Sequence, residues 1–301
     1  DDRIKKSEIP QKVLNRFNVS FLNASEKNRY NYYRKFDFNK IICFGNVPPP
    51  ILFFHKTKIY VFQHNALLFN NNYSKYNYDY LSSFIFRLKR LYIKFLMSRS
   101  VVILCQTNHF KNILTKHFPK NKILKTPFFS NLTPIHEKKI KGFIYPSMGA
   151  PHKNHDRLLE AWLLAKKYTI RIPLFLTISK SDKSLINKIN YMLDLGFDIR
   201  NLGEVSYEKI KDHYSLISHV IYPSLIESFG LVLLEAVMCN NIILSPDLQY
   251  SKEIIKSDLY FDPYSSKDIS EKIVQSLNVK KTTSTLKIKN NFDKIISIIN
   301  E

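Results

Sequence analysis

The stretch Pro223-Ser-Leu-Ile-Glu-Ser-Phe-Gly-Leu-Val-Leu-Leu-Glu-Ala-Val237 decides how the rest of the chain is interpreted. A short apolar run, His219–Tyr222, precedes it and predicts a strand. The stretch then continues as a helix from about Phe229 to Cys239. Gly230 lets a ligand approach the start of this helix, where free N–H groups and the positive end of the helix dipole suit a phosphate. The pattern therefore predicts an anion site after a strand.

Two carboxylates belong to this stretch, Glu227 in the loop and Glu235 inside the helix. Their separation is a little over two helical turns, so both side chains can face the same cleft. Glu235 stands among apolar residues and needs a polar partner, which the two hydroxyls of a ribose would supply. The alternative is an ordinary pair of glutamates, one at a helix start and one paired with a basic residue.

Short apolar runs alternate with stretches of helical period along most of the chain, which predicts an α/β fold with doubly wound parallel sheets. In the first half we expect strands at Val19–Leu22, Lys40–Phe44, Lys58–Phe62 and Val101–Cys105, and helices at Tyr80–Arg99 and Thr107–His117. In the second half we expect strands at Phe143–Tyr145, Leu174–Ser179, Ile199–Leu202, Ile242–Ser245 and Leu259–Phe261, with helices at Asp156–Lys167, Ser184–Leu195, Ser206–Ile217 and Ser251–Lys256. A polar segment between Phe129 and Gly142 predicts the domain boundary.

The central stretch resembles the signature of retaining glycosyltransferases of the GT-B fold, the family 4 or group 1 type. That signature, Glu-x-Phe-Gly-x-x-x-x-Glu-Ala, is matched by Glu227, Phe229, Gly230, Glu235 and Ala236. The segment from Tyr145 to Trp162 resembles the donor loop of that family, and the segment from Val61 to Leu68 resembles members that build bacterial surface polysaccharides. The resemblance implies two Rossmann-like domains facing across a cleft. These are an acceptor-side domain over 1–135 and a nucleotide-sugar domain over 143–280, with a C-terminal helix in 281–301 packing back on the first.

The resemblance also implies roles for single residues. Lys153 would neutralise the diphosphate leaving group, and Glu227 would act beside the sugar as a catalytic residue. His64 is the catalytic candidate of the first domain, although a lone histidine is as readily structural. The remaining donor-binding candidates are Glu235, Gly230, Phe229, Leu231, Ser147 and Val205.

Two of these positions, Lys153 and Ser147, and some residues near them have open alternatives. Lys153 is equally the kind of lysine that a solvated loop contains. Ser147 stands where the family usually has an arginine, so one cationic phosphate contact is missing or supplied elsewhere. His152 and His155 are candidates to replace it, or else they only cap the following helix. Gln106 and Thr107 follow another strand, and Thr107 is also a good helix N-cap.

The sequence has no Asp-x-Asp motif, the pair with which many other glycosyltransferases hold a divalent metal. We therefore expect a metal-independent site with no cofactor, in which a nucleotide-diphosphate sugar is the donor substrate. The three cysteines, Cys43, Cys105 and Cys239, lie far apart and predict neither disulfides nor a zinc site. Their pattern fits a reducing, cytoplasmic setting.

The 301-residue chain has 46 Lys and Arg against 25 Asp and Glu, a formal charge of +21. Such an excess favours anionic partners, namely nucleic acid, anionic lipid or phosphorylated ligands, unless it only reflects codon usage. Arg87, Arg90 and Lys94 share one face of the predicted helix Tyr80–Arg99. That helix either docks on an anionic membrane or packs on its sheet with a basic outer face.

The resemblance implies transfer of a hexose to a growing, lipid-linked oligosaccharide in O-antigen or capsule assembly. The protein would act in the cytoplasm, at the inner face of the plasma membrane, and would not bind nucleic acid. Two alternatives remain: a sugar-nucleotide epimerase of the same fold, and a basic nucleic-acid-binding protein. The family's opening strand and glycine-rich turn have no counterpart here, because the first glycine is Gly45. We therefore expect the first domain to lack its first βα unit and the chain to be a fragment of reduced activity.

Overall fold

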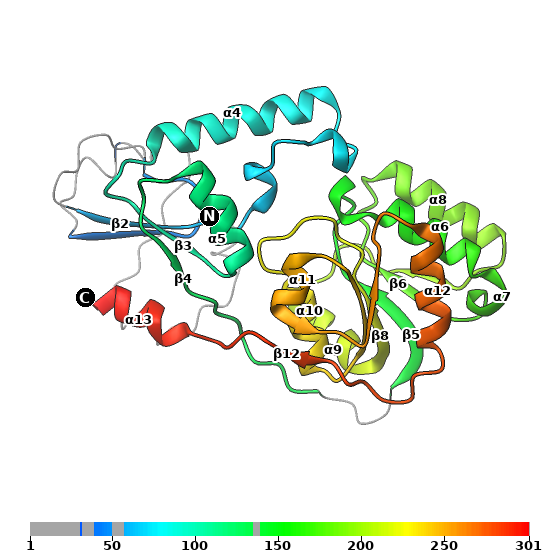
Figure 1. The fold of residues 1–301 in the computed structure, drawn as a ribbon. Helices are drawn as coiled ribbons and strands as arrows, with labels where there is room; N and C mark the ends of the chain where they lie inside the picture. Colours follow the sequence, from blue (N-terminus) through cyan, green and yellow to red (C-terminus); the bar gives the residue numbers. More distant parts are fainter. Residues whose placement is uncertain (1–30, 32–38, 50–56, 135–138, 301) are drawn as a thin grey trace.

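The computed structural model describes residues 31, 39–49, 57–134 and 139–300. The strand predicted at Val19–Leu22 lies outside these residues. Two separate parallel sheets, each with helices around it, form the two halves of the molecule (Figure 1). The predicted α/β fold is confirmed.

The first sheet has four strands in chain order, and every neighbouring pair is parallel. They are β1 (Lys40–Cys43), β2 (Lys58–Phe62), β3 (Val102–Cys105) and β4 (Ile123–Lys125). The first three agree with the sequence, whereas β4 was not predicted because its three residues lie among lysines. Between β2 and β4 the chain forms the helices η1 (Ala66–Phe69), η2 (Ser74–Tyr76), α4 (Tyr80–Leu96) and α5 (Asn108–His117).

The second sheet has six parallel strands in the order β11-β9-β8-β5-β6-β7. They are β5 (Ile140–Tyr145), β6 (Leu174–Leu176), β7 (Ile199–Asn201), β8 (Ile217–Ile221), β9 (Ile242–Pro246) and β11 (Leu259–Phe261). This is the order of a Rossmann fold, in which the direction of winding reverses between β5 and β8. The loops that follow these two strands therefore meet at one place.

The helices of the second half cover both faces of this sheet. They are η3 (Pro151–Lys153), α6 (His155–Leu164), α7 (Lys166–Thr169), α8 (Lys183–Asp194), α9 (Tyr207–Leu216), α10 (Leu231–Met238), α11 (Gln249–Ile254) and α12 (Ser266–Ser276). The helix predicted over Ser251–Lys256 ends at Ile254. The next two residues form β10 (Ile255–Lys256), which pairs antiparallel with β12 (Thr285–Leu286).

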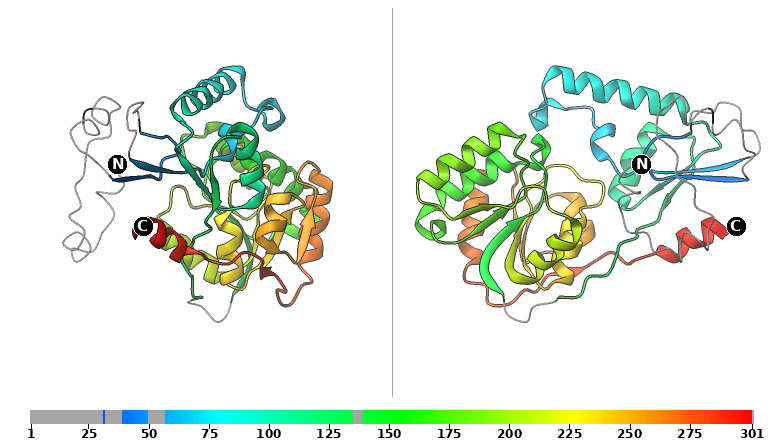
Figure 2. Two further views of the ribbon diagram at one scale, coloured as in Figure 1. Left: turned by 60° about the vertical axis from the view of Figure 1, so that its left-hand side comes forward. Right: turned by 180° about the vertical axis from the view of Figure 1, so that it is seen from behind.

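The chain passes between the two halves twice, along neighbouring paths (Figure 1). The backbone N–H of Asn291 donates to the carbonyl oxygen of Pro127 at 2.7 Å, which joins the two crossings. After the second crossing, α13 (Phe292–Asn300) returns to the first sheet, where Ile298 packs with Tyr60, Phe62 and Leu104. The views agree that α4 and α13 lie on opposite sides of the first half (Figures 1 and 2). The domain limits at 135, 143 and 280 stay a prediction.

Candidate active site

The site lies where the second sheet reverses its winding. Lys153 ends the short helix η3 in the loop after β5, and Glu227 lies in the loop after β8. Because β5 and β8 are hydrogen-bonded neighbours, their following loops lie side by side. The Lys153 ammonium consequently forms an ion pair with Glu227, with 2.5 Å between Nζ and Oε1.

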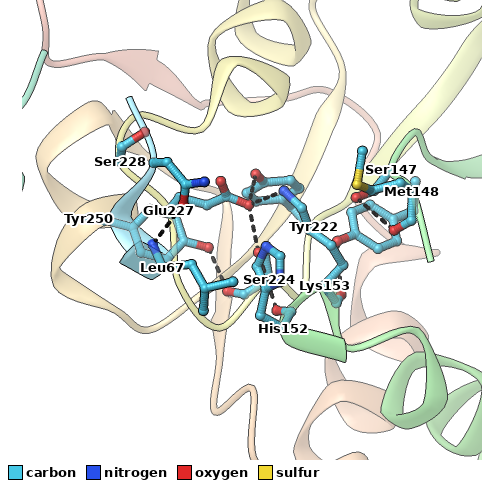
Figure 3. Close-up of polar contacts among 12 residues, drawn as sticks. Leu67, Ser147, Met148, His152, Lys153, Tyr222, Ser224, Glu227, Ser228 and Tyr250 are labelled. Atoms are coloured by element: carbon cyan, nitrogen blue, oxygen red, sulfur yellow. Dashed lines mark hydrogen bonds and ion pairs between the residues drawn. The ribbon is translucent and has the colours of Figure 1, made fainter. Parts of the chain in front are cut away.

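The Glu227 carboxylate receives two further hydrogen bonds on the same oxygen. The hydroxyls of Tyr222 and Ser224 donate to Oε1 at 2.7 and 2.6 Å (Figure 3). Burial by itself raises the pKa of this carboxyl, but the Lys153 charge and the hydrogen bonds outweigh burial, so that the pKa is lower than usual. Glu227 is therefore a carboxylate at neutral pH.

Asn154 fixes the shape of the lysine loop. Its backbone is left-handed, with φ of 65°, a conformation that asparagine tolerates better than most residues. Its side-chain amide donates to the carbonyl oxygens of Pro223 and Pro263 at 3.1 and 2.8 Å. Asn154 thus links the loop after β5 to the loop after β8 and keeps Lys153 close to Glu227.

The β8 loop is also anchored in the other half of the molecule, because Leu225 and Ile226 are buried in the core of the first half. The loop ends at Gly230, whose φ of 78° is a left-handed conformation that glycine adopts without strain. Gly230 precedes α10 and has no side chain to cap it. The first amides of α10 therefore face outward with the positive end of the helix dipole.

Glu235, one and a quarter turns into α10, has only 7% of its surface exposed. Burial raises the pKa of this carboxyl, and the nearby phenols of Tyr214 and Tyr207 only partly offset that effect. Tyr207 was not identified from the sequence, since it looks like an ordinary first residue of a helix.

These groups surround a cavity of about 900 Å³ between the two halves. Seven of the predicted site residues line it: His64, Lys153, Glu227, Phe229, Gly230, Leu231 and Glu235. Phe62, Gln106, Phe128 and Phe129 contribute from the first half, and Asn290 and Phe292 from the returning segment before and within α13. The cavity thus brings together an ion pair, a helix N-terminus and the buried carboxyl of Glu235, with aromatic side chains in its walls.

Residues 132–291, more than half of the chain, match the family model described as glycosyl transferases group 1. The chain belongs to this family. Over 201 residues it is 26% identical to the O-antigen chain mannosyltransferase RfbU of Salmonella typhimurium, covering 61% of this chain and 53% of the relative. Over 138 residues it is 32% identical to O-antigen chain mannosyltransferase B of Escherichia coli, covering 44% of this chain and 36% of the relative. The chain spans about half the length, or less, of the curated relatives it matches.

Two solved structures show the same fold. Sucrose-phosphate synthase from Thermosynechococcus elongatus superimposes with a TM-score of 0.64 and 14% identity, over 84% of this chain and 67% of that one. The pneumococcal O-GlcNAc transferase GtfA superimposes with a TM-score of 0.54 and 18% identity, over 75% and 47%. This member of the group 1 family therefore has the GT-B fold expected from its sequence. Neither the epimerase nor the nucleic-acid-binding alternative gains support from these comparisons.

Two donor-binding candidates lie away from the main cavity of this glycosyltransferase. Ser147 lines a neighbouring hollow of about 400 Å³, together with Lys153 and Glu227. Val205 is only partly buried, packs against the core of the second half and is not among the residues that line the main cavity. Tyr207, two residues later, takes that place.

His64 is held by Asn46, a residue that the sequence did not single out. The Asn46 side chain accepts the backbone N–H of His64 at 2.7 Å, and its amide lies 3.1 Å from Nε2 of the ring. The ring also stacks on Phe62, and burial lowers its pKa. Ser228 of the β8 loop donates to the His64 carbonyl at 2.7 Å, which joins the two halves at the edge of the cavity.

The two histidines near Lys153 are not cations at neutral pH. Burial and the Lys153 charge lower the pKa of His152 to about 4 and that of His155 to about 3. His152 Nδ1 lies 2.7 Å from the Tyr78 hydroxyl of the first half, and the His155 ring packs at a tilt against the Tyr145 ring, with 4.6 Å between the centroids. Burial beside the Lys153 ammonium therefore disfavours a cationic role for these two histidines, and their replacement of a missing arginine stays a prediction.

The polar pair after β3, Gln106 and Thr107, makes contacts that shape the site. Gln106 donates to the carbonyl oxygen of Phe128 at 2.9 Å. Thr107 is the N-cap of α5, accepting the backbone N–H of Phe110 at 3.1 Å, and its hydroxyl donates to the carbonyl oxygen of Ser228 at 2.9 Å. This hydroxyl is a second link between the first half and the β8 loop.

Across the part of the chain that the structure describes, no three His, Cys, Asp or Glu side chains gather as they would around a metal ion. Metal independence stays a prediction. Cys43, Cys105 and Cys239 are buried, and among the described residues none of them forms a disulfide. Among the same residues, we find no helix with the length and apolar character needed to cross a bilayer.

Proposed function

We propose that this glycosyltransferase moves a hexose from a nucleotide-diphosphate sugar, with retention of configuration, to a lipid-linked saccharide in O-antigen or capsule assembly. We place this reaction in the cytoplasm, at the inner face of the plasma membrane. Membership of the group 1 family and the names of the two curated relatives support the proposal. Because the chain spans only part of those relatives, its activity, donor and acceptor are matters for experiment.

The distribution of charge around the cavity suggests how each group would act. As the sugar leaves, positive charge grows on its ring and negative charge on the diphosphate. We assign Lys153 and the N-terminus of α10 to the diphosphate, and Glu227 to the sugar side. Glu235 would accept hydrogen bonds from the ribose hydroxyls. His64, on the opposite wall, would face the reacting sugar.

The contacts of Glu227 are the observation on which the proposal chiefly rests. Among the described residues, all three donors reach Oε1, and none of them reaches Oε2. One oxygen is thus committed to Lys153, Tyr222 and Ser224, and the second remains for a ligand in the cavity. A purely structural ion pair has no need to border a cavity of this size.

Binding of nucleotide diphosphates tests the proposal. The matching nucleotide should raise the unfolding temperature, because a ligand at a hundred times its Kd stabilises by about 2.7 kcal/mol. Glu235→Gln should weaken calorimetric binding by about 1–3 kcal/mol, the scale of hydrogen bonds to a charged group. The exposed Glu204→Gln is the matched control and should bind like the parent chain. Equal affinity for parent and Glu235→Gln would exclude the ribose role, and the absence of any binding nucleotide would contradict the proposed donor.

A further inference from the structure

Helix α4 is packed with its apolar side outward. Ile93 and Leu96 are its buried residues, and Arg90 turns toward the protein, donating to the Asn70 carbonyl at 2.7 Å and the Asn71 side chain at 2.8 Å. The sequence-based alternatives both assumed that Arg87, Arg90 and Lys94 form the outer face. That assumption is wrong, since Arg90 is taken up by contacts within the first half.

The outward side of α4 is a continuous apolar stripe. Phe84, Leu88, Leu91 and Phe95 follow one another at spacings of four, three and four residues, which places them on one face of a helix. Leu91 and Phe95 are 61% and 67% exposed. The exposed apolar residues of the helix are Tyr80, Leu81, Phe84, Ile85, Leu88, Leu91, Tyr92 and Phe95. A contiguous exposed patch of this kind marks a binding surface.

Arg87 and Lys94 border this stripe on one side, whereas Lys89 lies farther around the helix, nearer its buried side. Arg87, Lys89 and Lys94 are exposed, and α4 contains no acidic residue. Beneath the helix lies a hollow of about 530 Å³ with Arg90, Lys94 and Lys116 among the residues that line it. The views of the fold place α4 along the outer edge of the molecule (Figures 1 and 2). An apolar face bordered by cations suits a surface that is apolar inside and anionic outside.

We propose that α4 is an interfacial helix whose apolar stripe inserts into an anionic lipid bilayer, with lipid phosphates bound by the flanking basic residues and the hollow beneath. The helix has 17 residues, about 25 Å, and would lie flat with its stripe about 5–10 Å below the headgroups. A second copy of the chain is a poorer occupant, because its own Arg87, Lys89 and Lys94 would face these cations. Membrane binding by α4 would bring the cavity to a lipid-linked acceptor, and this part of the inference rests on the proposed function.

Vesicle sedimentation with the full chain, without sugar donor, tests the inference independently of catalysis. The parent chain should bind vesicles containing phosphatidylglycerol and bind pure phosphatidylcholine much more weakly. Leu88→Gln/Leu91→Gln/Phe95→Gln should lose binding to both. A triple change at Arg87, Lys89 and Lys94 to Gln should weaken binding to anionic vesicles about a hundredfold, at roughly fivefold for each basic residue.

A matched control removes three exposed apolar residues from the second half. Leu164→Gln/Tyr191→Gln/Leu193→Gln should bind vesicles like the parent, since these side chains lie on α6 and α8. Nucleotide binding should be unchanged in all these variants. If nucleotide binding fails while vesicle binding behaves as expected, the proposed function is contradicted and the inference stands.

Insertion can be observed directly with a tryptophan. The chain has one, Trp162, which is fully buried in the second half and gives a constant background. In Leu88→Trp, anionic vesicles should shift the emission to shorter wavelength. Unshifted emission from vesicle-bound protein, or equal vesicle binding by the apolar variant, would overturn the inference. A different result would also overturn it: the parent chain does not bind vesicles but forms a concentration-dependent dimer, and the apolar variant does not form that dimer.

Discussion

At the scale of single residues, the Lys153–Glu227 pair separates binding from turnover. Glu227→Gln should lower kcat by about 10²–10³ while leaving affinity for the free nucleotide diphosphate nearly intact, because the charge on the sugar develops only in the transition state. Lys153→Met should reduce both quantities, since the diphosphate is present before and during the reaction. Single-turnover rates and calorimetric affinities of the two variants check this. A Glu227→Gln variant that loses nucleotide affinity yet turns over bound donor normally would contradict the assignment.

His155 makes the stability of the fold sensitive to acid. Its two ring nitrogens have no hydrogen-bond partner among the described residues, and its pKa is lowered to about 3 by burial. Below about pH 6.5 this histidine binds a proton in the unfolded chain but not in the folded chain. The free energy of unfolding is therefore highest above that pH and falls as the pH decreases toward 3. At about 1.4 kcal/mol per pH unit, the loss between pH 6.5 and 5 is about 2 kcal/mol.

We therefore expect His155→Phe, which keeps an aromatic ring against Tyr145, to show a smaller loss of unfolding free energy between pH 7 and pH 5. The difference from the parent chain should be about 2 kcal/mol in urea titrations at the two pH values. Buried His152 and His219, each with a pKa lowered to about 4 by burial, remain in the variant and keep part of the acid sensitivity. Identical losses for parent and variant would show that His155 does not cause the effect.

The sequence allowed us to predict the site residues that belong to a recognisable pattern, but not the residues that hold them in place. Glu227, Gly230 and Glu235 stand in one signature, so their place after a strand could be predicted. Asn46 and Tyr207 could not, because each reaches the site only through the packing of distant segments. Ser224, three residues before Glu227, is the support for which a local signal did exist.

At the scale of elements, α5 takes part of its N-terminal capping from the other half of the molecule, in addition to Thr107. Both oxygens of Glu253 in α11 accept backbone N–H groups at the start of α5, from Asn108 at 2.6 Å and His109 at 2.7 Å. A carboxylate there satisfies free amides and opposes the helix dipole. This contact holds the two halves together as well as starting the helix.

Glu253→Ala should consequently lower the unfolding free energy by about 1 kcal/mol, the usual cost of losing a helix cap. It should also separate the halves, increasing the radius of gyration in X-ray scattering. Glu271→Ala, on the exposed side of α12, is the control and should change neither quantity. A Glu253→Ala chain as compact and stable as the parent would rule out the dual role.

Helices and strands were predicted correctly where the hydrophobic periodicity was strong. They were missed or misplaced where contacts with distant segments determine the structure. Most strands of the second sheet contain buried apolar runs and were found, whereas β4 has three residues and owes its existence to pairing with β3. Helix α11 stopped two residues before its predicted end because Ile255 and Lys256 pair with β12. Periodicity located α4 but could not say which of its sides faces the protein.

At the scale of the whole molecule, α13 completes the first half. Ile298 is 5% exposed and packs against Tyr60, Phe62 and Leu104 of the first sheet. Ile298→Asp would place an unpaired charge in that contact, so we expect a loss of about 2–5 kcal/mol in unfolding free energy, or release of the helix. Ile296→Asp, on the exposed side of the same helix, should cost much less. Calorimetry and amide exchange of α13 would measure both, and equal effects of the two changes would contradict this packing.

The paired crossings between the halves restrict how these bodies can rotate. A single connecting strand would permit swivelling in any direction, whereas two that are hydrogen-bonded side by side, from Asn291 to Pro127, leave essentially one axis, parallel to the line between them. Displacement grows with distance from that axis. The largest excursions should therefore occur on the side of α4, opposite the crossings (Figure 1). A surface that binds α4 would therefore hold the first half at the point farthest from this rotation axis, where a small force has the largest effect on the angle between the halves.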